Sequence, residues 1–239
     1  MAPMTQPQPE PRGEPLALYL RDVLLGAGSG GTRLYLIRHA QSRGNRGEYE
    51  HADRDPPLSE VGREQARRLG ERFARHAVDA IYSSPLRRTR ATADAIAAVT
   101  GLDVSILDDL REVDLGETAE DYWQYTDEQV AALREKVARD QRWDSFPAGE
   151  GSEAARRRLA GAMDRIVAEC DGRRVAVVTH GAAIMTYVSH VLGLDADFVF
   201  YPFNAGITSI RARDDRRVIW RLNDIAHLDG LPSGFGGIS

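Results

Sequence analysis

The sequence predicts an α/β fold, a three-layer sandwich with a mostly parallel central sheet and helices on both faces. Two observations carry this prediction. From residue 33 onward, short apolar runs alternate with longer segments of helical period. Two of the runs, residues 33–37 and 175–179, are almost entirely apolar, as is typical of strands covered on both faces. The length of 239 residues, 42% of them hydrophobic, suffices for one large domain.

The expected elements follow one another in a regular order. Strands are expected at residues 33–37, 80–82, 104–106, 175–179, 207–210 and 218–222. Apolar side chains at helical spacing mark helices over 61–73, 86–96, 130–137, 159–167 and 184–191. Ser59 is placed to cap the first of these helices, and Ser84 with Pro85 is placed to start the second. Both signals place helix starts directly after loops.

The domain organisation is read from composition. Residues 1–32 are expected to form a disordered Pro-rich tail, a short helix at 16–25 and a Gly-rich linker. Residues 33–228 form the predicted domain, and 229–239 a flexible C-terminal tail. The linker glycines spell GxGxxG, but this dinucleotide fingerprint must follow a strand, whereas here it precedes one. A nicotinamide oxidoreductase is therefore the least favoured function.

Charge and cysteine content narrow the classes of partner. The formal net charge of −5 provides no global basic field for nucleic acid or an acidic membrane surface. No apolar run approaches the ~18 residues of a membrane span. The single cysteine, Cys170, cannot form an internal disulfide, and no Cys/His spacing typical of a metal site is present. These features predict a cytoplasmic protein without a metal or a cofactor.

Two histidines stand at the carboxyl ends of predicted buried strands, where open α/β sheets bind ligands. His39 follows the strand at 33–37, and His180 follows the strand at 175–179. A single histidine in such a position more often caps a loop. Each of these two precedes a small residue and a helix-like stretch, so we expect two helix N-termini to direct amide groups into one crevice. That arrangement would bind an anion.

Arginines supply positive charge near both histidines. Arg38 precedes His39, and the helix after the second strand begins with Arg87, Arg88 and Arg90. Arginine at a helix start is unfavourable to the helix dipole, so the cluster favours an anionic partner. The simpler interpretation is a solvated face, since at most one or two of the three side chains can enter a crevice. Asn45 could add an uncharged contact. Such a pocket suits a phosphoryl group without magnesium.

Several segments together resemble the histidine phosphatase superfamily, which includes the cofactor-dependent phosphoglycerate mutases. The segments are LYLIRHAQS (34–42), PLSEVGREQA (57–66), YSSPLRR (82–88), LRE (110–112), LG (115–116), VVTHG (177–181), and Asn204 with Ile207 and Thr208. They occur in the family's order from residue 33 to about 228. The resemblance implies a histidine phosphatase-like catalytic domain over 33–228.

The resemblance also implies roles for individual residues. His39 would attack phosphorus and form a phosphohistidine intermediate. Arg38 and Arg88 would grip the phosphoryl oxygens, with a neutral contact from Asn45. His180 would donate to the same oxygens. The attacking imidazole must be unprotonated, and the neighbouring positive charges would keep it so.

The resemblance places the family's acid at Glu112, which would protonate the leaving alkoxide and then take a proton from the attacking water. The alternative is a surface carboxylate paired with Arg111. The sequence departs from the family at Ala40, where a glycine is usual, and at residues 117–121, which replace an aromatic-acidic-glycine run. The second departure concerns substrate recognition rather than the nucleophile.

The motifs are compatible with three functions. The favoured one is metal-independent hydrolysis of a small phosphomonoester, since the residues after His39 and Glu112 differ from those of the family's mutases. Phosphoglycerate mutase-type phosphotransfer and a non-catalytic phospho-ligand-binding module are the alternatives. A binding module would be free to lose the nucleophile or the acid, and this chain retains both. The sequence leaves the substrate and a homodimer open.

Overall fold

The computed structural model describes residues 31–47, 55–116 and 125–231. The elements in chain order are β1 (Thr32–Arg38), η1 (Gly44–Arg46), α2 (Glu60–Arg75), β2 (Ala80–Ser83), α3 (Arg87–Thr100), β3 (Val104–Ile106), η2 (Asp108–Leu110), α5 (Asp127–Asp140), η4 (Trp143–Ser145), α6 (Gly151–Glu169), β4 (Arg174–Thr179), α7 (Gly181–Leu192), β5 (Ile207–Arg213), β6 (Arg216–Asp224) and η5 (Ala226–Leu228). The expected tails at 1–32 and 229–239 lie almost wholly outside the described residues.

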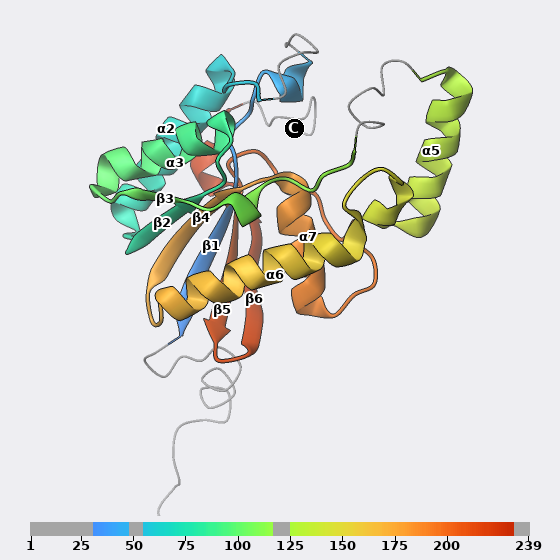
Figure 1. The fold of residues 1–239 in the computed structure, drawn as a ribbon. Helices are drawn as coiled ribbons and strands as arrows, with labels where there is room; N and C mark the ends of the chain where they lie inside the picture. The colour runs from blue at the N-terminus through green and yellow to red at the C-terminus, as the bar shows by residue number, and fades with distance from the viewer. Residues whose placement is uncertain (1–30, 48–54, 117–124, 232–239) are drawn as a thin grey trace, which may run out of the picture.

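The central sheet has six strands in the order β3-β2-β4-β1-β5-β6. Neighbouring strands from β3 to β1 are parallel, whereas β5 is antiparallel to β1 and β6 is antiparallel to β5. Figure 1 shows α2 and α3 against one face of this sheet and α6 with α7 against the other. The predicted three-layer α/β fold with a mostly parallel sheet is therefore confirmed.

Successive side chains of the two central strands, β1 and β4, point to opposite faces of the sheet and build the two halves of the core. Leu34 and Leu36 of β1 pack with Val177 of β4 in the cluster that contains α6 and α7 side chains. Ile37 and Val178 point the other way, into the cluster beneath α2 and α3. All of these side chains are fully buried. Because successive residues of a strand point to opposite faces, a strand covered on both faces must be apolar throughout.

Helices α2 and α3 approach closely through a glycine. A Cβ atom on Gly70 would lie 2.4 Å from the backbone oxygen of Ala95, so only a residue without a side chain fits there. The start of α2 is set by Ser59, whose hydroxyl accepts a hydrogen bond from the Gly62 amide at 3.0 Å, as the sequence predicts. Helix α3 differs from expectation: it begins at Arg87, after Ser84 and Pro85, and has no side-chain cap.

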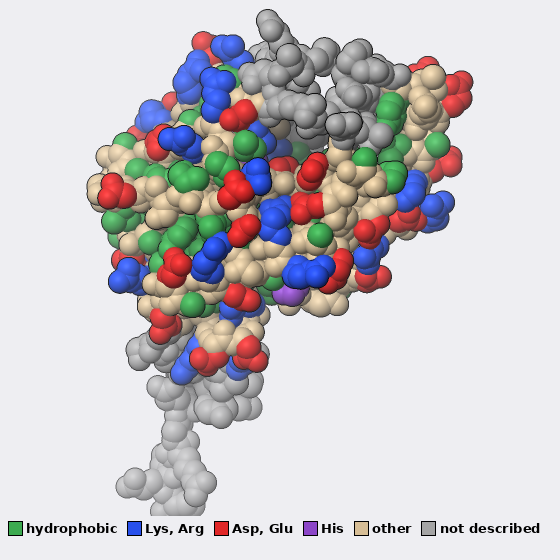
Figure 2. Space-filling model, in the orientation of Figure 1, with side chains coloured by type: hydrophobic (Ala, Val, Ile, Leu, Met, Phe, Trp, Pro, Cys, Tyr) green, Lys and Arg blue, Asp and Glu red, His purple; other side chains and the backbone are tan. Residues whose placement is uncertain are grey.

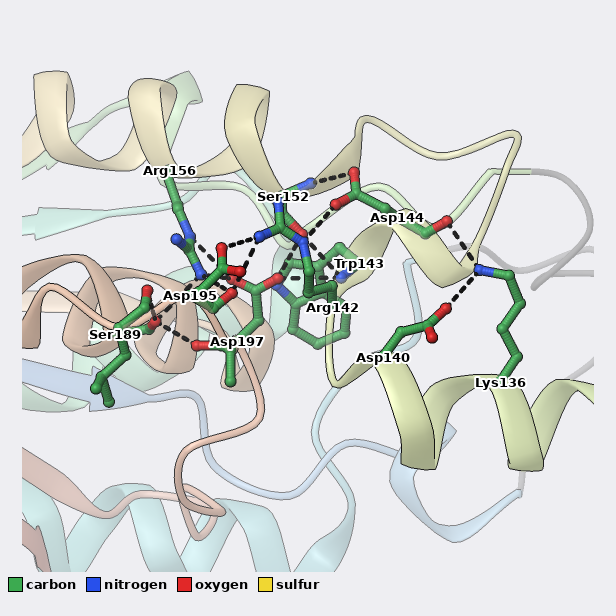
Figure 3. A network of polar contacts seen from close by, with 12 residues as sticks. Lys136, Asp140, Arg142, Trp143, Asp144, Ser152, Arg156, Ser189, Asp195 and Asp197 are labelled. Carbon is green, nitrogen blue, oxygen red and sulfur yellow. Dashed lines mark hydrogen bonds and ion pairs between the residues drawn. The ribbon is translucent and has the colours of Figure 1, made fainter.

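Helix α5 projects away from the sheet and is joined to the main body through η4 (Figure 1). A buried polar network anchors this junction (Figure 3). The fully buried carboxylate of Asp197 accepts hydrogen bonds from the Trp143 amide and the Arg156 guanidinium, each at 3.0 Å, and from Ser152. The Trp143 indole N–H donates to Thr186 of α7 at 2.7 Å. These bonds hold η4 against α6 and α7. Helix α5 directly precedes η4 in the chain and is attached to the main body through it.

Charged side chains of both signs are interspersed over the face drawn in Figure 2. Exposed side chains of the described chain form ion pairs, such as Arg165 with Asp109 at 2.8 Å and Arg111 with Asp108 at 2.6 Å. Pairs of this exposed kind contribute little to stability, about 0–1 kcal/mol each. Within the described ranges, no helix combines the length and the apolar character needed to cross a membrane.

Replacing Gly62 by alanine tests the packing of α2 against the loop that follows β1. The new Cβ would lie 1.9 Å from the backbone oxygen of Gln41, so either α2 or this loop must shift. We expect the free energy of unfolding to fall by roughly 1–3 kcal/mol. Gly161→Ala is the control, because nothing lies within 4 Å of its added Cβ and alanine favours a helix by up to about 1 kcal/mol. Urea unfolding of both variants measures the difference, and equal stabilities would contradict this account.

Candidate active site

The two predicted histidines meet at the carboxyl ends of adjacent strands. His39 follows β1, and His180 follows β4, its parallel neighbour, in a register that pairs Arg38 with Thr179. The two imidazole rings lie with their centroids 5.2 Å apart, edge to face. Both side chains are almost fully buried. The sheet topology therefore brings together residues separated by more than half of the chain.

Only one of the two expected helix N-termini faces this site. His180 is the N-cap residue of α7, as expected. His39 is instead followed by a loop, the three-residue turn η1 and further loop, and α2 begins only at Glu60. The prediction of a helix directly after His39 is wrong, because small residues after the histidine do not by themselves form a helix nucleus. Ala40, in place of the family's glycine, does not adopt the left-handed backbone region.

The hydrogen bonds of His39 define its tautomer. Its Nδ1 lies 2.8 Å from the backbone oxygen of Ala40, which can only accept, so this nitrogen carries the proton. Its Nε2 lies 3.3 Å from Nε of Arg88, which can only donate. The Nε2 atom is therefore unprotonated, with its lone pair directed at the Arg88 guanidinium, and an unprotonated nitrogen is what a nucleophile requires.

His180 is held in the opposite tautomer by the same arginine. A terminal guanidinium nitrogen of Arg88 lies 3.3 Å from Nδ1 of His180, so that nitrogen accepts. The proton is then on Nε2, which donates to the buried Ser84 hydroxyl at 2.8 Å. Ser84, which the sequence suggests as the start of a helix, is thus a partner of the second histidine. A role for His180 in positioning Arg88 is visible here.

Both imidazoles have pKa values well below the ordinary histidine value. For His39, burial is the largest cause, followed by the positive charges of Arg88 and Arg38; the bond to Ala40 opposes them weakly. For His180, burial again leads, followed by His39 and then Arg88. The expectation that positive neighbours keep the nucleophile neutral is supported, with burial as the stronger contribution.

Arg88 connects the two histidines to an acidic residue. Its remaining terminal nitrogen lies 3.4 Å from the Asp55 carboxylate, which also accepts from the Arg87 amide at the start of α3 at 2.9 Å. Burial lowers the pKa of Arg88, while the charges of Glu112 and Asp55 oppose this effect. Asp55 therefore holds both the guanidinium and the helix start beside His39.

Arg38 is a buried cation without a carboxylate partner among the described residues. One terminal nitrogen donates to the Tyr201 hydroxyl at 2.9 Å and to the Pro202 oxygen at 2.7 Å, and the guanidinium lies over the Tyr201 ring. Its Nε is buried, and no residue in the described part of the chain accepts a hydrogen bond from it. A Cβ on Gly181 would lie 3.3 Å from this nitrogen, so the glycine allows close approach. A buried, unsatisfied donor of this kind is suited to an anionic ligand.

Glu112 lies at the N-terminus of α7. Its Oε1 accepts from the Ala183 amide at 2.9 Å, and its Oε2 lies 3.4 Å from the Ala182 amide. The alternative of a surface pair with Arg111 is not observed, since that arginine binds Asp108 at 2.6 Å. The carboxyl group and the two histidines are therefore gathered around the same helix start.

Asn45 lies at the edge of the site rather than against the histidines. Its side-chain oxygen accepts from the Ser42 amide at 3.0 Å and from the Asn204 amide group at 3.2 Å. The same group of Asn204 donates to the His39 backbone oxygen at 3.0 Å. Among the described residues no group accepts a hydrogen bond from the Asn45 amide nitrogen, which is thus placed to contact a ligand.

As expected, not all three arginines at the start of α3 enter the site. Arg88 enters the site, whereas the side chains of Arg87 and Arg90 are exposed. Sequence reasoning missed Asp55 and Tyr201, which hold the two site arginines. Both lie in loops where no periodicity or motif distinguishes one polar residue from another. Among the described residues, no group of three or more His, Cys, Asp or Glu side chains is placed to hold a metal ion.

A family model for the histidine phosphatase superfamily (branch 1) matches residues 34–225. The chain belongs to this superfamily. Phosphoserine phosphatase 1 of Hydrogenobacter thermophilus is 33% identical to it over 207 residues, which cover 82% of this chain and 94% of that relative. A probable phosphoglycerate mutase GpmB of Salmonella choleraesuis is 30% identical over 204 residues, covering 82% and 95%.

Solved structures of phosphatases resemble the fold of this chain. A mycobacterial glucosyl-3-phosphoglycerate phosphatase complexed with VO3 has 28% identity and a TM-score of 0.66, over 80% of this chain and 98% of that one. Phosphoserine phosphatase of Entamoeba histolytica, at 22% identity and a TM-score of 0.68 over 82% and 99%, shares the fold. Membership of the superfamily and these phosphatase relatives identify the chain as an enzyme of the phosphatase type.

The buried neutral histidines predict a fall in stability at mildly acidic pH. Above about pH 6.5 both states hold these imidazoles neutral. Below it the unfolded chain takes up protons that the folded site resists, so the free energy of unfolding falls by about 1.4 kcal/mol per pH unit for each histidine. His227, whose pKa burial lowers to about 4, acts in the same direction.

Urea unfolding between pH 5 and pH 7 measures this slope. This window lies above the usual pKa range of carboxyl groups. We expect the double variant His39→Asn with His180→Asn to lose most of the slope and to retain the part due to His227. An unchanged slope in the double variant would show that these imidazoles do not titrate as the burial implies.

Proposed function

We propose that the chain is a metal-independent phosphomonoesterase that acts through a phosphohistidine on His39. One observation carries the proposal. The buried, unprotonated Nε2 of His39 lies against the Arg88 guanidinium and near Arg38, which has no carboxylate partner among the described residues. A nucleophile next to unsatisfied cationic donors is the arrangement that phosphoryl transfer requires.

In the first step, Nε2 of His39 attacks phosphorus, and the bond from phosphorus to the ester oxygen breaks. Arg38 and Arg88 stabilise the charge that develops on the phosphoryl oxygens. The leaving alkoxide takes a proton from Glu112. The carboxylate that remains is stabilised by the Ala182 and Ala183 amides, with which Glu112 already forms hydrogen bonds.

In the second step, water attacks the phosphohistidine, and Glu112 takes up the proton that the water loses. The bond between His39 and phosphorus breaks, which returns a neutral imidazole and releases inorganic phosphate. The Ala40 carbonyl holds the proton on Nδ1 throughout, so the leaving nitrogen is the one that attacked. His180 keeps Arg88 aligned in both steps, and the amide nitrogen of Asn45 supplies a neutral contact.

A phosphoglycerate mutase reaction is the second candidate, favoured by the 30% identity to a probable mutase. Both reactions share the first step and differ in whether water or a second hydroxyl receives the phosphoryl group. We favour water, because the residues that follow His39 and Glu112 differ from the mutase pattern. Assay with 2- and 3-phosphoglycerate separates the two: release of phosphate supports hydrolysis, and interconversion without release supports transfer.

For the substrate we propose a small phosphorylated metabolite. The relatives named for phosphoserine and for glucosyl-3-phosphoglycerate act on phosphomonoesters that also carry a carboxylate. Phosphoserine and 3-phosphoglycerate are therefore the first compounds to assay, followed by sugar phosphates.

Replacing His39 by alanine tests the nucleophile. With p-nitrophenyl phosphate and a chelator present, we expect the wild type to turn over and the variant to lose at least about 10³-fold in kcat. Rapid quenching of the wild type should trap an acid-labile, base-stable phosphoenzyme. His190→Ala is the matched control, because that exposed histidine lies far along α7. Equal turnover in all three proteins would refute the assignment.

Replacing Glu112 by glutamine tests the acid through the leaving group. A nitrophenolate leaves without a proton, whereas the alkoxide of phosphoserine does not. We expect the first step, followed by rapid quenching of phosphoenzyme formation, to slow by about 10²–10⁴-fold with phosphoserine but by less than about tenfold with p-nitrophenyl phosphate. The second step, in which Glu112 takes the proton of water, should slow equally with both substrates. A purely structural role at the start of α7 would lower both first-step rates equally, and thermal unfolding monitors that role separately.

A further inference from the structure

A small groove lies apart from the candidate active site, between the C-terminal end of α2 and the sheet face of β1, β5 and β6. Its volume is about 150 Å³. Arg33, which lines it, lies near the start of β1, whereas His39 follows the end of that strand, roughly 20 Å away at the usual rise of an extended chain. The groove is thus a second, separate feature of the molecule.

Two arginines face one another across this groove. Arg33 of β1 and Arg211 of β5 are directly opposite in the antiparallel register. Like charges in such a pair are destabilising, by roughly 0.2–1 kcal/mol. Neither guanidinium forms an ion pair or a hydrogen bond with another described residue, and burial together with Arg33 lowers the pKa of Arg211. An anion between them would remove the repulsion.

The next cross-strand pair supplies two hydroxyl groups on the same face. Tyr35 of β1 lies opposite Ser209 of β5, and both line the groove. Neither side chain hydrogen-bonds to another described residue. Two residues along each strand return to the same face of a sheet, so the hydroxyls and the guanidiniums share one side. The two guanidiniums and the two hydroxyls therefore lie on one small patch, and none of them donates a side-chain hydrogen bond to another described residue.

The rim of the groove is also cationic. Arg72 of α2 and Arg221 of β6 share the single carboxylate of Asp224. The Trp220 ring, 49% exposed, lies beneath the Arg211 guanidinium at 5.7 Å. Four arginines against one aspartate form a local positive patch in a chain whose net charge is −5.

We propose that this groove binds a tetrahedral oxyanion, either free phosphate or the phosphoryl group of a larger ligand. Arg33 and Arg211 would hold it from both sides, and the hydroxyls of Tyr35 and Ser209 would donate to its oxygens. The volume suits an ion, since drug-sized ligands occupy about 300–1,000 Å³. The described lining holds no counterpart of the paired histidines: its one histidine, His76, contacts the Arg72 backbone oxygen at 3.2 Å, so we expect the anion to bind there without chemistry. The proposal does not depend on the proposed function.

Equilibrium dialysis with radioactive phosphate at low ionic strength counts the sites. We expect the wild type to bind one phosphate more per chain than the double variant Arg33→Gln with Arg211→Gln. The matched control is Arg213→Gln with Arg216→Gln, which removes two arginines at the exposed end of the same hairpin, outside the groove. Hydrolysis of p-nitrophenyl phosphate, including its inhibition by phosphate, should be unchanged in both double variants, because it reports the active site.

Trp220 fluorescence locates the binding. A saturable change on adding phosphate should occur in the wild type and be absent in Trp220→Phe. Adenosine monophosphate, the second probe, distinguishes free phosphate from the phosphoryl group of a larger ligand. At least tenfold tighter binding than phosphate indicates a nucleotide whose base contacts Trp220, and equal or weaker binding indicates free phosphate. The proposal fails if the groove variant and the control lose the same binding, or if the groove variant retains the additional phosphate.

Discussion

The contact of one guanidinium with two imidazoles determines the chemistry of the site. Because an arginine only donates, Arg88 requires a lone pair on His39 Nε2 and another on His180 Nδ1. The remaining protons must then lie on the opposite nitrogens, where Ala40 and Ser84 accept them. Burial prevents either ring from escaping this arrangement by protonation. A single cation thus sets both tautomers.

The sequence predicted this cluster to the extent that topology creates it. Parallel strands end at the same edge of a sheet, so histidines that follow β1 and β4 had to meet. The loop residues that hold the arginines obey no such rule. Asp55 and Tyr201 reach the site from connections whose paths depend on the packing of the whole domain. Their polar side chains resemble those of any exposed loop, and only the folded chain distinguishes them.

The local helix-start signal at Ser84 was wrong, because the Ser84 hydroxyl contacts a residue far along the chain. Ser84 before Pro85 has the pattern of a helix start, but its hydroxyl is occupied by His180, and α3 begins three residues later without a side-chain cap. Ser59 caps α2 as its sequence predicts, although its hydroxyl also donates to the Gln41 side chain at 2.7 Å. At Ser84 the contact with His180 of the candidate active site therefore takes precedence over the local helix signal.

Each of the two proposed anion sites contains arginine without a carboxylate partner among the described residues. Most exposed arginines of the described chain neighbour a carboxylate, which has little energetic consequence because water screens the pair. Arg38 is different, since a buried guanidinium without a carboxylate keeps its desolvation cost until an anion arrives. Arg33 and Arg211 carry a smaller cost of the same kind, from mutual repulsion. What separates the two places is the proposed nucleophile: beside Arg38 an anion would meet Nε2 of His39, whereas between Arg33 and Arg211 it would meet guanidinium and hydroxyl groups.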